Sequence, residues 1–287
     1  MDLKKLAFSL TLSASLFACC GDDSGTTTTS TTTTTAPPTE DFGVCTPTGD
    51  PILYRLNALN IPTPEQAMDG DVVGHNVDRV GDTCGVPDYD GGVDNSLIDL
   101  AAALPTLAPM HPVDLQQEID NGLNCAVGDT TCTRIDLIVS ITTGANCVIV
   151  EVEDGEGEAL AGPFNGSLDG SGTMRGVVSS LNLSIPYGTD TGTVDIDLAV
   201  TNVIITGNRT DTALTNVVIG GALVQSDFET TIMNLLPLLG GDITFEDIGP
   251  TLENLYDVQS GGNCAALSVG LTASGVPYTP PAVAVAN

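Results

Sequence analysis

The stretch of sequence that decides the fold reads LNLSIPYGTDTGTVDIDLAVTNVI, residues 181–204. Its first part alternates Leu181, Leu183 and Ile185 with polar residues. Its second part has an apolar face made of Val194, Ile196, Leu198, Val200 and Ile204. Polar residues such as Asp195 and Asp197 form the opposite face. This period of two indicates strands with one buried side and one wet side, and it is typical of long antiparallel strands.

The same period continues outward in both directions. Residues 135–141 and 148–152 alternate before this stretch, and residues 214–224 and 265–273 follow it. Abundant Val, Ile, Leu, Thr and Gly also favours a β-rich body with tight turns. We therefore predict a mainly β fold with helices (α+β), an antiparallel β-sandwich or curved sheet that the last strand closes, preceded by a disordered tether.

Helices are predicted at four places. One runs over 97–104, and another runs over 112–121 and stops at Gly122. A capping box of Ser226 and Glu229 precedes a third, and Pro250 opens a fourth. Their apolar faces are expected to pack in the core.

The first residues match a bacterial lipoprotein export signal. Lys4 and Lys5 precede 13 mostly apolar residues, 6–18, and the small Ala18 stands before a cysteine. The apolar run falls short of the ~20 residues that a membrane-spanning helix needs. We predict a signal peptide over residues 1–18 and lipidation of Cys19 with diacylglycerol and an acyl chain such as palmitate, with Cys20 as the alternative.

The chain beyond this anchor is expected to lie outside the inner membrane. Neither cysteine is followed by the aspartate that retains many lipoproteins there, which favours the outer membrane. Residues 19–43 are rich in Thr, Ser and Pro, and their few apolar side chains cannot offset the entropy cost of ordering, so we predict a disordered linker. An acidic loop-and-helix region over 44–125, a β-rich domain over 126–277 and a flexible tail over 278–287 follow.

The mature chain is strongly acidic. Removal of residues 1–18 takes away Asp2, Lys4 and Lys5, which leaves 36 acids, five arginines and a formal net charge of −31. Such a surface repels phosphate backbones, so we expect no nucleic-acid partner. The expected partners are the membrane, through the lipid anchor, and a protein or a matrix component.

Six cysteines lie beyond the anchor: Cys45, Cys84, Cys125, Cys132, Cys147 and Cys264. An even number in an oxidising compartment predicts three disulfides, and the absence of a C-x-x-C pair among them disfavours a zinc site. Many connectivities are possible. The one that we predict joins Cys125 to Cys132, Cys45 to Cys84 and Cys147 to Cys264.

An acidic, glycine-rich segment holds the residues that we predict to bind Ca²⁺, namely Asp78, Asp88, Asp90, Asp94 and Asn95. Residues 86–94 partly match the calcium loop D-x-D-x-D-G-x-x-D, with Val86 in place of the first acid. Carboxylate oxygens are the ligands that Ca²⁺ prefers, and glycine permits the tight turn. The alternative is an acidic turn in which Asp94, Asn95 or Ser96 caps the next helix.

Several short motifs lie along the chain: Gly74-His-Asn-Val-Asp78, Cys84, Asp88, Gly92-Val-Asp-Asn-Ser-Leu97, Gly220-Gly221 and Cys264-Ala-Ala-Leu-Ser-Val-Gly-Leu271. Together they resemble uncharacterised outer-membrane lipoproteins of myxobacterial type. The resemblance covers about residues 50–276. It implies an exported, lipid-anchored and β-rich protein, and it brings no established activity.

No recognisable catalytic motif stands in the sequence. It lacks Gly-x-Ser-x-Gly, His-Glu-x-x-His and a P-loop, and its only histidines are His75 and His111. We therefore expect a non-enzymatic binding or structural module stabilised by disulfides and Ca²⁺. Two alternatives stay open: an exported hydrolase that uses carboxylates or His75, and a carrier whose apolar cavity holds a lipid.

Overall fold

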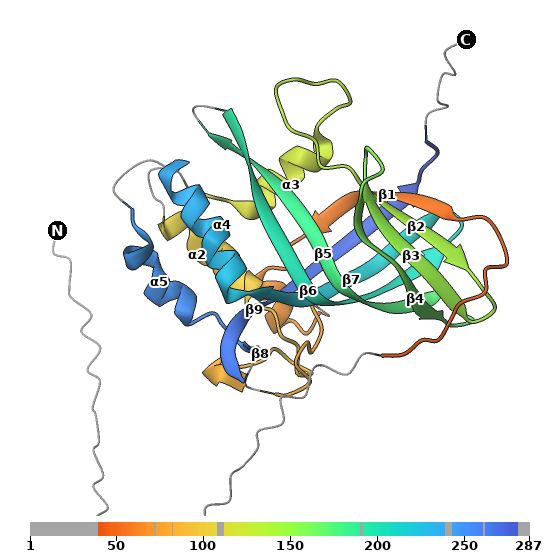
Figure 1. Cartoon of the computed structure of the whole chain (residues 1–287), viewed down its shortest axis with the longest axis horizontal. Helices are drawn as coiled ribbons and strands as arrows, with labels where there is room; N and C mark the ends of the chain where they lie inside the picture. The colour runs from red at the N-terminus through yellow and green to blue at the C-terminus, as the bar shows by residue number, and fades with distance from the viewer. Residues whose placement is uncertain are drawn as a thin grey trace, which may run out of the picture. The chain divides into compact units, whose positions relative to one another are not determined.

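The computed structural model describes residues 40–71, 73–81, 83–107, 112–189, 192–238, 243–260 and 262–280. In this part of the chain the main element is a curved antiparallel sheet of nine strands in the order β1-β2-β3-β4-β5-β6-β7-β9-β8 (Figure 1). The strands are β1 (Ile52–Asn60), β2 (Leu137–Thr143), β3 (Cys147–Asp154), β4 (Ala159–Leu168), β5 (Thr173–Thr189), β6 (Gly192–Thr210), β7 (Ala213–Val224), β8 (Val258–Ser260) and β9 (Asn263–Pro277). The predicted fold class is confirmed, as a single curved sheet.

The last long strand closes this sheet on itself, as the sequence predicts. Strand β9 pairs with β7 on one side, for example Leu223 with Leu267, and with β1 on the other, where Leu59 pairs with Ala273. Strand β1 in turn pairs with β2. Closure leaves few unpaired backbone groups at the strand edges, which removes a site for aggregation. The short β8 adds to β9 before the closed part begins.

The alternating apolar residues fill the inside of the closed sheet. On the two longest strands, Leu181, Leu183, Ile196 and Leu198 are all buried in one cluster with the inner faces of the other strands. Full burial of each such side chain contributes roughly 1.5–3 kcal/mol. An apolar cavity of about 20 Å³ lies among these inner side chains, which is the room of about one water molecule.

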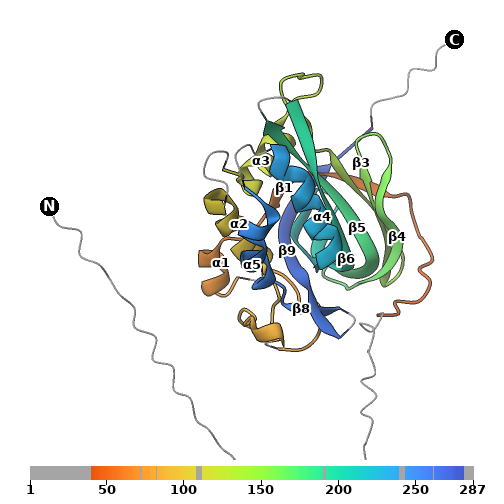
Figure 2. The ribbon, with the colours of Figure 1, turned by 60° about the vertical axis from the view of Figure 1, so that its left-hand side comes forward.

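Five α-helices cover one side of the sheet, opposite β3 and β4 (Figure 2). Within the described residues they are α1 (Pro64–Met68), α2 (Leu97–Leu107), α3 (Leu115–Asn124), α4 (Gln225–Leu235) and α5 (Phe245–Glu253). Helix α3 packs on β1 and β5, α4 on β6, β7 and β9, and α2 on β9. Phe228 and Ile232 of α4 and Leu252 of α5 are buried in the main core, which confirms that the apolar helix faces are core.

The boundaries of α3 differ from the prediction over 112–121. The helix begins after Asp114, whose Oδ1 accepts a hydrogen bond from the Gln117 N–H at 3.0 Å. It continues through Gly122 to Asn124, so this glycine does not end the helix and instead allows Ile135 to pack closely against it. A Cβ there would lie 2.5 Å from Cγ1 of Ile135.

The predicted starts of the two later helices were wrong. Helix α4 begins at Gln225 without a side-chain cap, and Glu229 instead accepts hydrogen bonds from Gln225 and from the hydroxyl of Tyr256. The Glu229 carboxylate therefore bonds to these two side chains and not to the backbone at the start of the helix. Helix α5 begins after Thr244, which forms a capping box with Asp247, so Pro250 lies inside the helix.

Three disulfides form, as predicted, and they are typical of an extracytoplasmic protein. The Cys125–Cys132 pairing is confirmed. The other two predicted pairings are wrong, because the structure joins Cys45 to Cys147 and Cys84 to Cys264. The segment before β1 lies at the β2–β3 turn, where the Thr48 N–H donates to the Thr143 carbonyl, and this places Cys45 beside β3.

Residues 44–125 contribute β1 to the closed sheet, so they fold together with the strands of residues 126–277. Within the described residues, each helix is too short or too polar to cross a lipid bilayer. The predicted signal peptide, Cys19, Cys20 and linker residues up to 39 lie outside the described residues. The same is true of His111 and of tail residues 281–287.

Candidate binding groove

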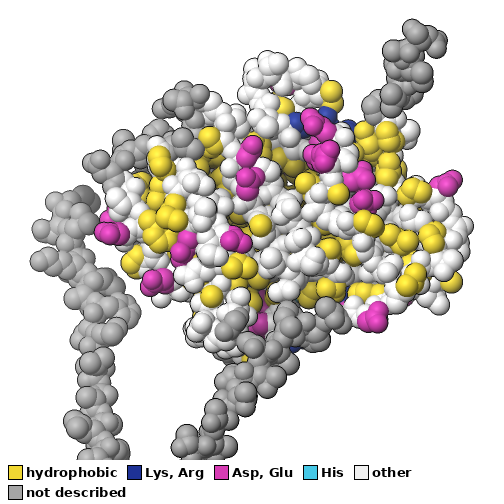
Figure 3. Space-filling view, in the orientation of Figure 1, with side chains coloured by type: hydrophobic (Ala, Val, Ile, Leu, Met, Phe, Trp, Pro, Cys, Tyr) yellow, Lys and Arg dark blue, Asp and Glu magenta, His cyan; other side chains and the backbone are white. Residues whose placement is uncertain are grey.

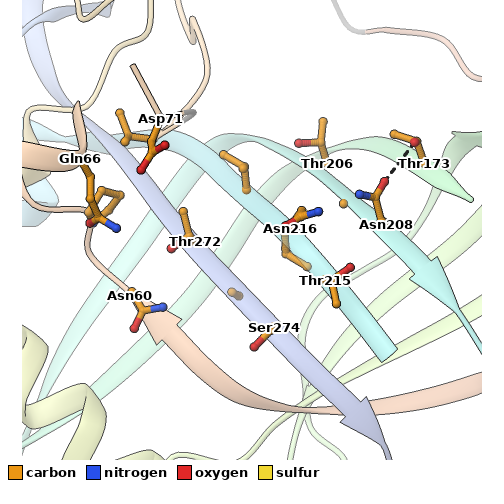
Figure 4. Close-up of a pocket in the computed structure, with 16 residues that line it drawn as sticks. Asn60, Gln66, Asp71, Thr173, Thr206, Asn208, Thr215, Asn216, Thr272 and Ser274 are labelled. Atoms are coloured by element: carbon orange, nitrogen blue, oxygen red, sulfur yellow. Dashed lines mark hydrogen bonds between the residues drawn. The ribbon is translucent and has the colours of Figure 1, made fainter. Parts of the chain in front are cut away.

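A groove of about 730 Å³ lies on the outer face of the sheet, across β6, β7 and β9 (Figure 4). Its floor carries a hydroxyl- and amide-bearing set of side chains, namely Thr206, Asn208, Thr215, Asn216, Thr272 and Ser274. Asn60, at the end of β1, and Gln66 and Asp71, in and after α1, line the side opposite Thr173 of β5. Segments from across the chain therefore build one polar groove.

Strand alternation and one irregularity explain why these side chains point outward. On β9, Leu271 and Ala273 face the core, so Thr272 and Ser274 between and beyond them face out. The β7–β9 register shifts between Leu214 and Val217. Such a bulge re-aims side chains. It exposes Thr215 and Asn216 together, and Asn216 adopts a φ of 49°.

The groove keeps most of its polar atoms available. Asn208 Oδ1 accepts a hydrogen bond from the Thr173 hydroxyl at 3.0 Å, and the Ser274 hydroxyl donates to Asn57 at 3.1 Å. For Asn60, Asp71, Thr215, Asn216 and Thr272, no side-chain hydrogen bond to another described residue is found. Hydroxyls and carboxamides can each donate and accept, so the lining offers both functions to a ligand.

His75 lies against the outer face of β7 at the edge of this groove. Its Nε2 is 3.3 Å from the Val218 carbonyl oxygen and 3.3 Å from the Thr206 hydroxyl. Gly220 allows this approach, because a Cβ there would lie 2.9 Å from the Cβ of His75. Burial lowers the pKa of the imidazole. In one tautomer Nε2 donates to the Val218 carbonyl, and in the other it accepts from the Thr206 hydroxyl.

Of the predicted calcium ligands, Asn95 fastens the segment of residues 73–81 and 83–96 to the sheet, and Asp94 ties parts of this segment together. Asn95 is 2 % exposed, and its side-chain amide bonds to the backbone N–H and carbonyl of Gly270, as a neighbouring strand would. It accepts from the Gly270 N–H at 2.8 Å and donates to the Gly270 carbonyl at 3.1 Å and to the Val73 carbonyl at 2.6 Å. Asp94 is 1 % exposed, and its Oδ2 accepts from the N–H of Val77 at 2.6 Å. Burial raises the pKa of Asp94 to about 7.

The other predicted calcium ligands lie in the same segment. Asp78 accepts a hydrogen bond from the Val80 N–H at 2.9 Å, Asp88 is half-buried, and Asp90 is exposed. Among the residues that the structure describes, no three His, Cys, Asp or Glu side chains are grouped so that they could hold a metal ion. The calcium site stays a prediction, whereas the hydrogen bonds of Asp94 and Asn95 to backbone groups are observed.

A buried polar cluster beside this segment was missed by sequence reasoning. The Ser268 side chain, expected on a wet face, is buried, and its hydroxyl accepts from the Ser96 N–H at 2.7 Å and donates to Asp257. Burial raises the pKa of Asp257. No local pattern identifies this cluster, because its members come from three separate segments.

An ion-pair cluster holds the start of the described chain next to the groove. Arg175 donates to both carboxylate oxygens of Glu40, at 2.9 and 2.8 Å, and Arg79 lies 3.3 Å from the same carboxylate. The hydrogen bonds from Arg175 hold the pKa of Glu40 below its usual value. Arg175 pairs in register with Thr206, so the chain enters the folded body at the groove edge.

Comparison of the chain with protein-family models, with curated proteins and with solved structures finds no match.

Proposed function

We propose that this extracytoplasmic protein is a lipid-anchored binding module of the outer membrane that holds a partner in the groove across β6, β7 and β9. The observation that carries the proposal is the groove itself, a concave site of about 730 Å³ with unpaired polar side chains. Its size falls within the ~300–1,000 Å³ of typical ligand sites. The export signal and the linker rich in threonine and proline support presentation away from the lipid, and so does the resemblance to myxobacterial-type lipoproteins.

The arrangement at His75 favours binding over hydrolysis. A hydrolase would need the imidazole to take a proton from a nucleophilic hydroxyl. Here the Thr206 hydroxyl lies 3.3 Å from Nε2, beyond the ~2.6–3.2 Å of such a pair, and the Val218 carbonyl lies at the same distance from this nitrogen. Its lowered pKa results from burial under the segment that covers β7. His75 therefore acts in packing.

The interior of the sheet does not favour the carrier alternative. Its apolar cavity of about 20 Å³ is surrounded by core side chains such as Leu56, Met174 and Ile219. An acyl chain needs many times this space, because each methylene adds its own volume to a close-packed interior. A binding role on the outer face needs no such opening.

Recovery of partners from the native envelope tests the proposal. The full chain, the Thr272→Lys variant and the Thr142→Lys variant would each be affinity-purified after cross-linking in cells. Both substitutions add one positive charge on the outer face of a strand, but only residue 272 lines the groove. We expect a component that Thr142→Lys retains and Thr272→Lys loses. Equal recovery by all three chains, or recovery by none, contradicts the proposal.

The anchor and the metal are tested separately. Metabolic labelling with a palmitate analogue should mark the unaltered chain, and the Cys19→Ser variant should lose the label, whereas labelling that only Cys20→Ser abolishes would move the anchor by one residue. Calorimetric titration with Ca²⁺ tests stabilisation through Asp78, Asp88 and Asp90, since extracellular sites bind at ~10⁻⁴–10⁻³ M. Absence of heat in millimolar Ca²⁺ would leave the acidic segment a purely folding element.

A further inference from the structure

We infer that the groove binds a neutral polyhydroxylated chain, that is, a segment of an uncharged glycan. This inference rests on the proposed binding function and adds the chemical class of the ligand. Three properties of the groove carry it: its charge, the kind of hydrogen-bonding groups that it offers, and the pairing of its floor strands.

The charge of the protein disfavours an anionic ligand. Each of the five arginines in the described residues lies within an ion pair with Glu40, Asp136 or Asp211. Figure 3 shows Asp and Glu spread over one face of the molecule, with few Lys or Arg side chains among them. The groove adds Asp71 and offers no cation among its described lining residues. A phosphate, sulfate or uronate group in the groove would therefore meet the charge of Asp71 and no cation among the described lining residues.

The hydrogen-bonding groups of the groove match hydroxyls. Carboxamides of Asn60 and Asn216 and hydroxyls of Thr215 and Thr272 each donate and accept, and Asp71 accepts only. A sugar hydroxyl also donates and accepts, so neighbouring hydroxyls of a sugar ring can satisfy an amide or a carboxylate with two parallel bonds. These side chains lie along the sheet from α1 towards Thr173 (Figure 4), which suits an extended chain.

The strand pairing of the floor disfavours a peptide bound through its backbone. An added peptide strand needs an open sheet edge with free N–H and C=O groups. Each floor strand already has neighbours on both sides: β6 pairs with β5 and β7, β7 with β6 and β9, and β9 with β7 and β1. The floor thus offers a ligand only its side chains, and those that are not buried carry hydroxyls and carboxamides.

Affinity electrophoresis of the full chain in detergent tests the inference. Native gels would contain neutral polysaccharides (dextran, mannan, galactomannan, arabinoxylan or mixed-linkage β-glucan) or the anionic polysaccharide alginate. We expect at least one neutral polymer to retard the protein and alginate to leave it unretarded. A Thr215→Val/Thr272→Val variant keeps the β-branched shape but loses two hydroxyls, so its affinity should fall about tenfold.

The control is Thr142→Val, which removes one threonine hydroxyl from the outer face of β2, away from the groove. Retardation by no neutral polymer, retardation by alginate, or equal loss of affinity in the control overturns the inference. The recovery of partners from the envelope tests the proposed binding function independently of these gels. If the envelope experiment still recovers a component that Thr272→Lys loses, the groove binds a ligand of another class. If nothing is recovered there either, the binding function itself fails.

Discussion

Replacement of Asn95 by alanine should remove the strongest link between residues 73–96 and the closed sheet. The side chain makes three hydrogen bonds, to the N–H and the carbonyl of Gly270 and to the carbonyl of Val73. All three backbone groups belong to buried residues, so truncation leaves them without partners. Each such group costs roughly 1–3 kcal/mol, and water that enters the vacated space recovers part of it, so we expect a loss of about 4 kcal/mol.

Urea-induced unfolding with the disulfides intact, followed by far-UV circular dichroism, measures this loss. About 4 kcal/mol is a large share of the ~5–15 kcal/mol that stabilises a typical domain. The control is Asn182→Ala, which removes the same amide from an exposed position of β5 and should change stability by less than about 0.5 kcal/mol. The loss in Asn95→Ala should also be the same in EDTA and in millimolar Ca²⁺, because the amide bonds only to backbone.

Two results would refute this reasoning. A loss below about 1 kcal/mol at an unchanged denaturant slope would mean that the three hydrogen bonds contribute little beyond what water supplies. A loss present only in Ca²⁺ and absent in EDTA would make Asn95 a calcium ligand, as one of the two sequence-based alternatives holds.

Three further predictions concern pH, disulfides and the ion-pair cluster. Burial raises the pKa of Asp94 in the folded state to about 7, so the folded state binds a proton on this carboxylate more tightly than the unfolded chain does. The contribution of Asp94 to the free energy of unfolding should therefore fall by up to roughly 4 kcal/mol as pH rises from 4 to 7. Asp94→Asn should flatten this dependence relative to the exposed control Asp195→Asn, and an unchanged profile would disprove the role of Asp94. Removal of the Cys84–Cys264 disulfide, which spans 180 residues, should lower stability by about 5 kcal/mol. Removal of Cys125–Cys132, which spans 7 residues, should lower it by about 2.5 kcal/mol, because the shorter loop restricts the unfolded chain less. Equal losses in calorimetry would reject this loop-entropy explanation. Glu40→Gln should speed proteolysis before Cys45 while lowering global stability by less than about 1 kcal/mol, since the pair is partly exposed; unchanged cleavage would show that the cluster does not hold the chain.

Sequence periodicity predicted the strands that alternate strictly and missed those that do not. Residues 181–189 lie in β5 and residues 192–204 in β6, and the expected side chains point inward as far as Val200. The prediction for Ile204 was wrong, because a bulge after Thr201 turns Val203 and Ile205 inward in its place. Strand β4 reads ALAGPFNGSL, where glycines and a proline hide the alternation, and β1 was not predicted at all. Backbone pairing with neighbours imposes these two strands, because closure of the sheet gives each of them a partner on both sides.

The candidate site was beyond sequence reasoning for a related reason. The predicted calcium ligands were singled out by the local density of polar residues, and two of them, Asp94 and Asn95, hydrogen-bond to backbone groups. The groove combines residues of β1, β5, β6, β7, β9 and α1, none of which forms a local motif. Disulfide number followed from composition and compartment, whereas the partners of Cys45 and Cys84 depended on where the chain passes over the sheet.

By itself the sequence determined the inward and outward faces of the main strands, the even set of paired cysteines and the strong negative charge, because these follow from local alternation and composition. Only the tertiary structure decided which outward faces are covered. On one strand, β9, the outward residues Ser268 and Gly270 are buried beneath residues 73–96, while Thr272 and Ser274 line an open groove. A period of two specifies which side of a strand a residue occupies, but what covers that side comes from segments far along the chain.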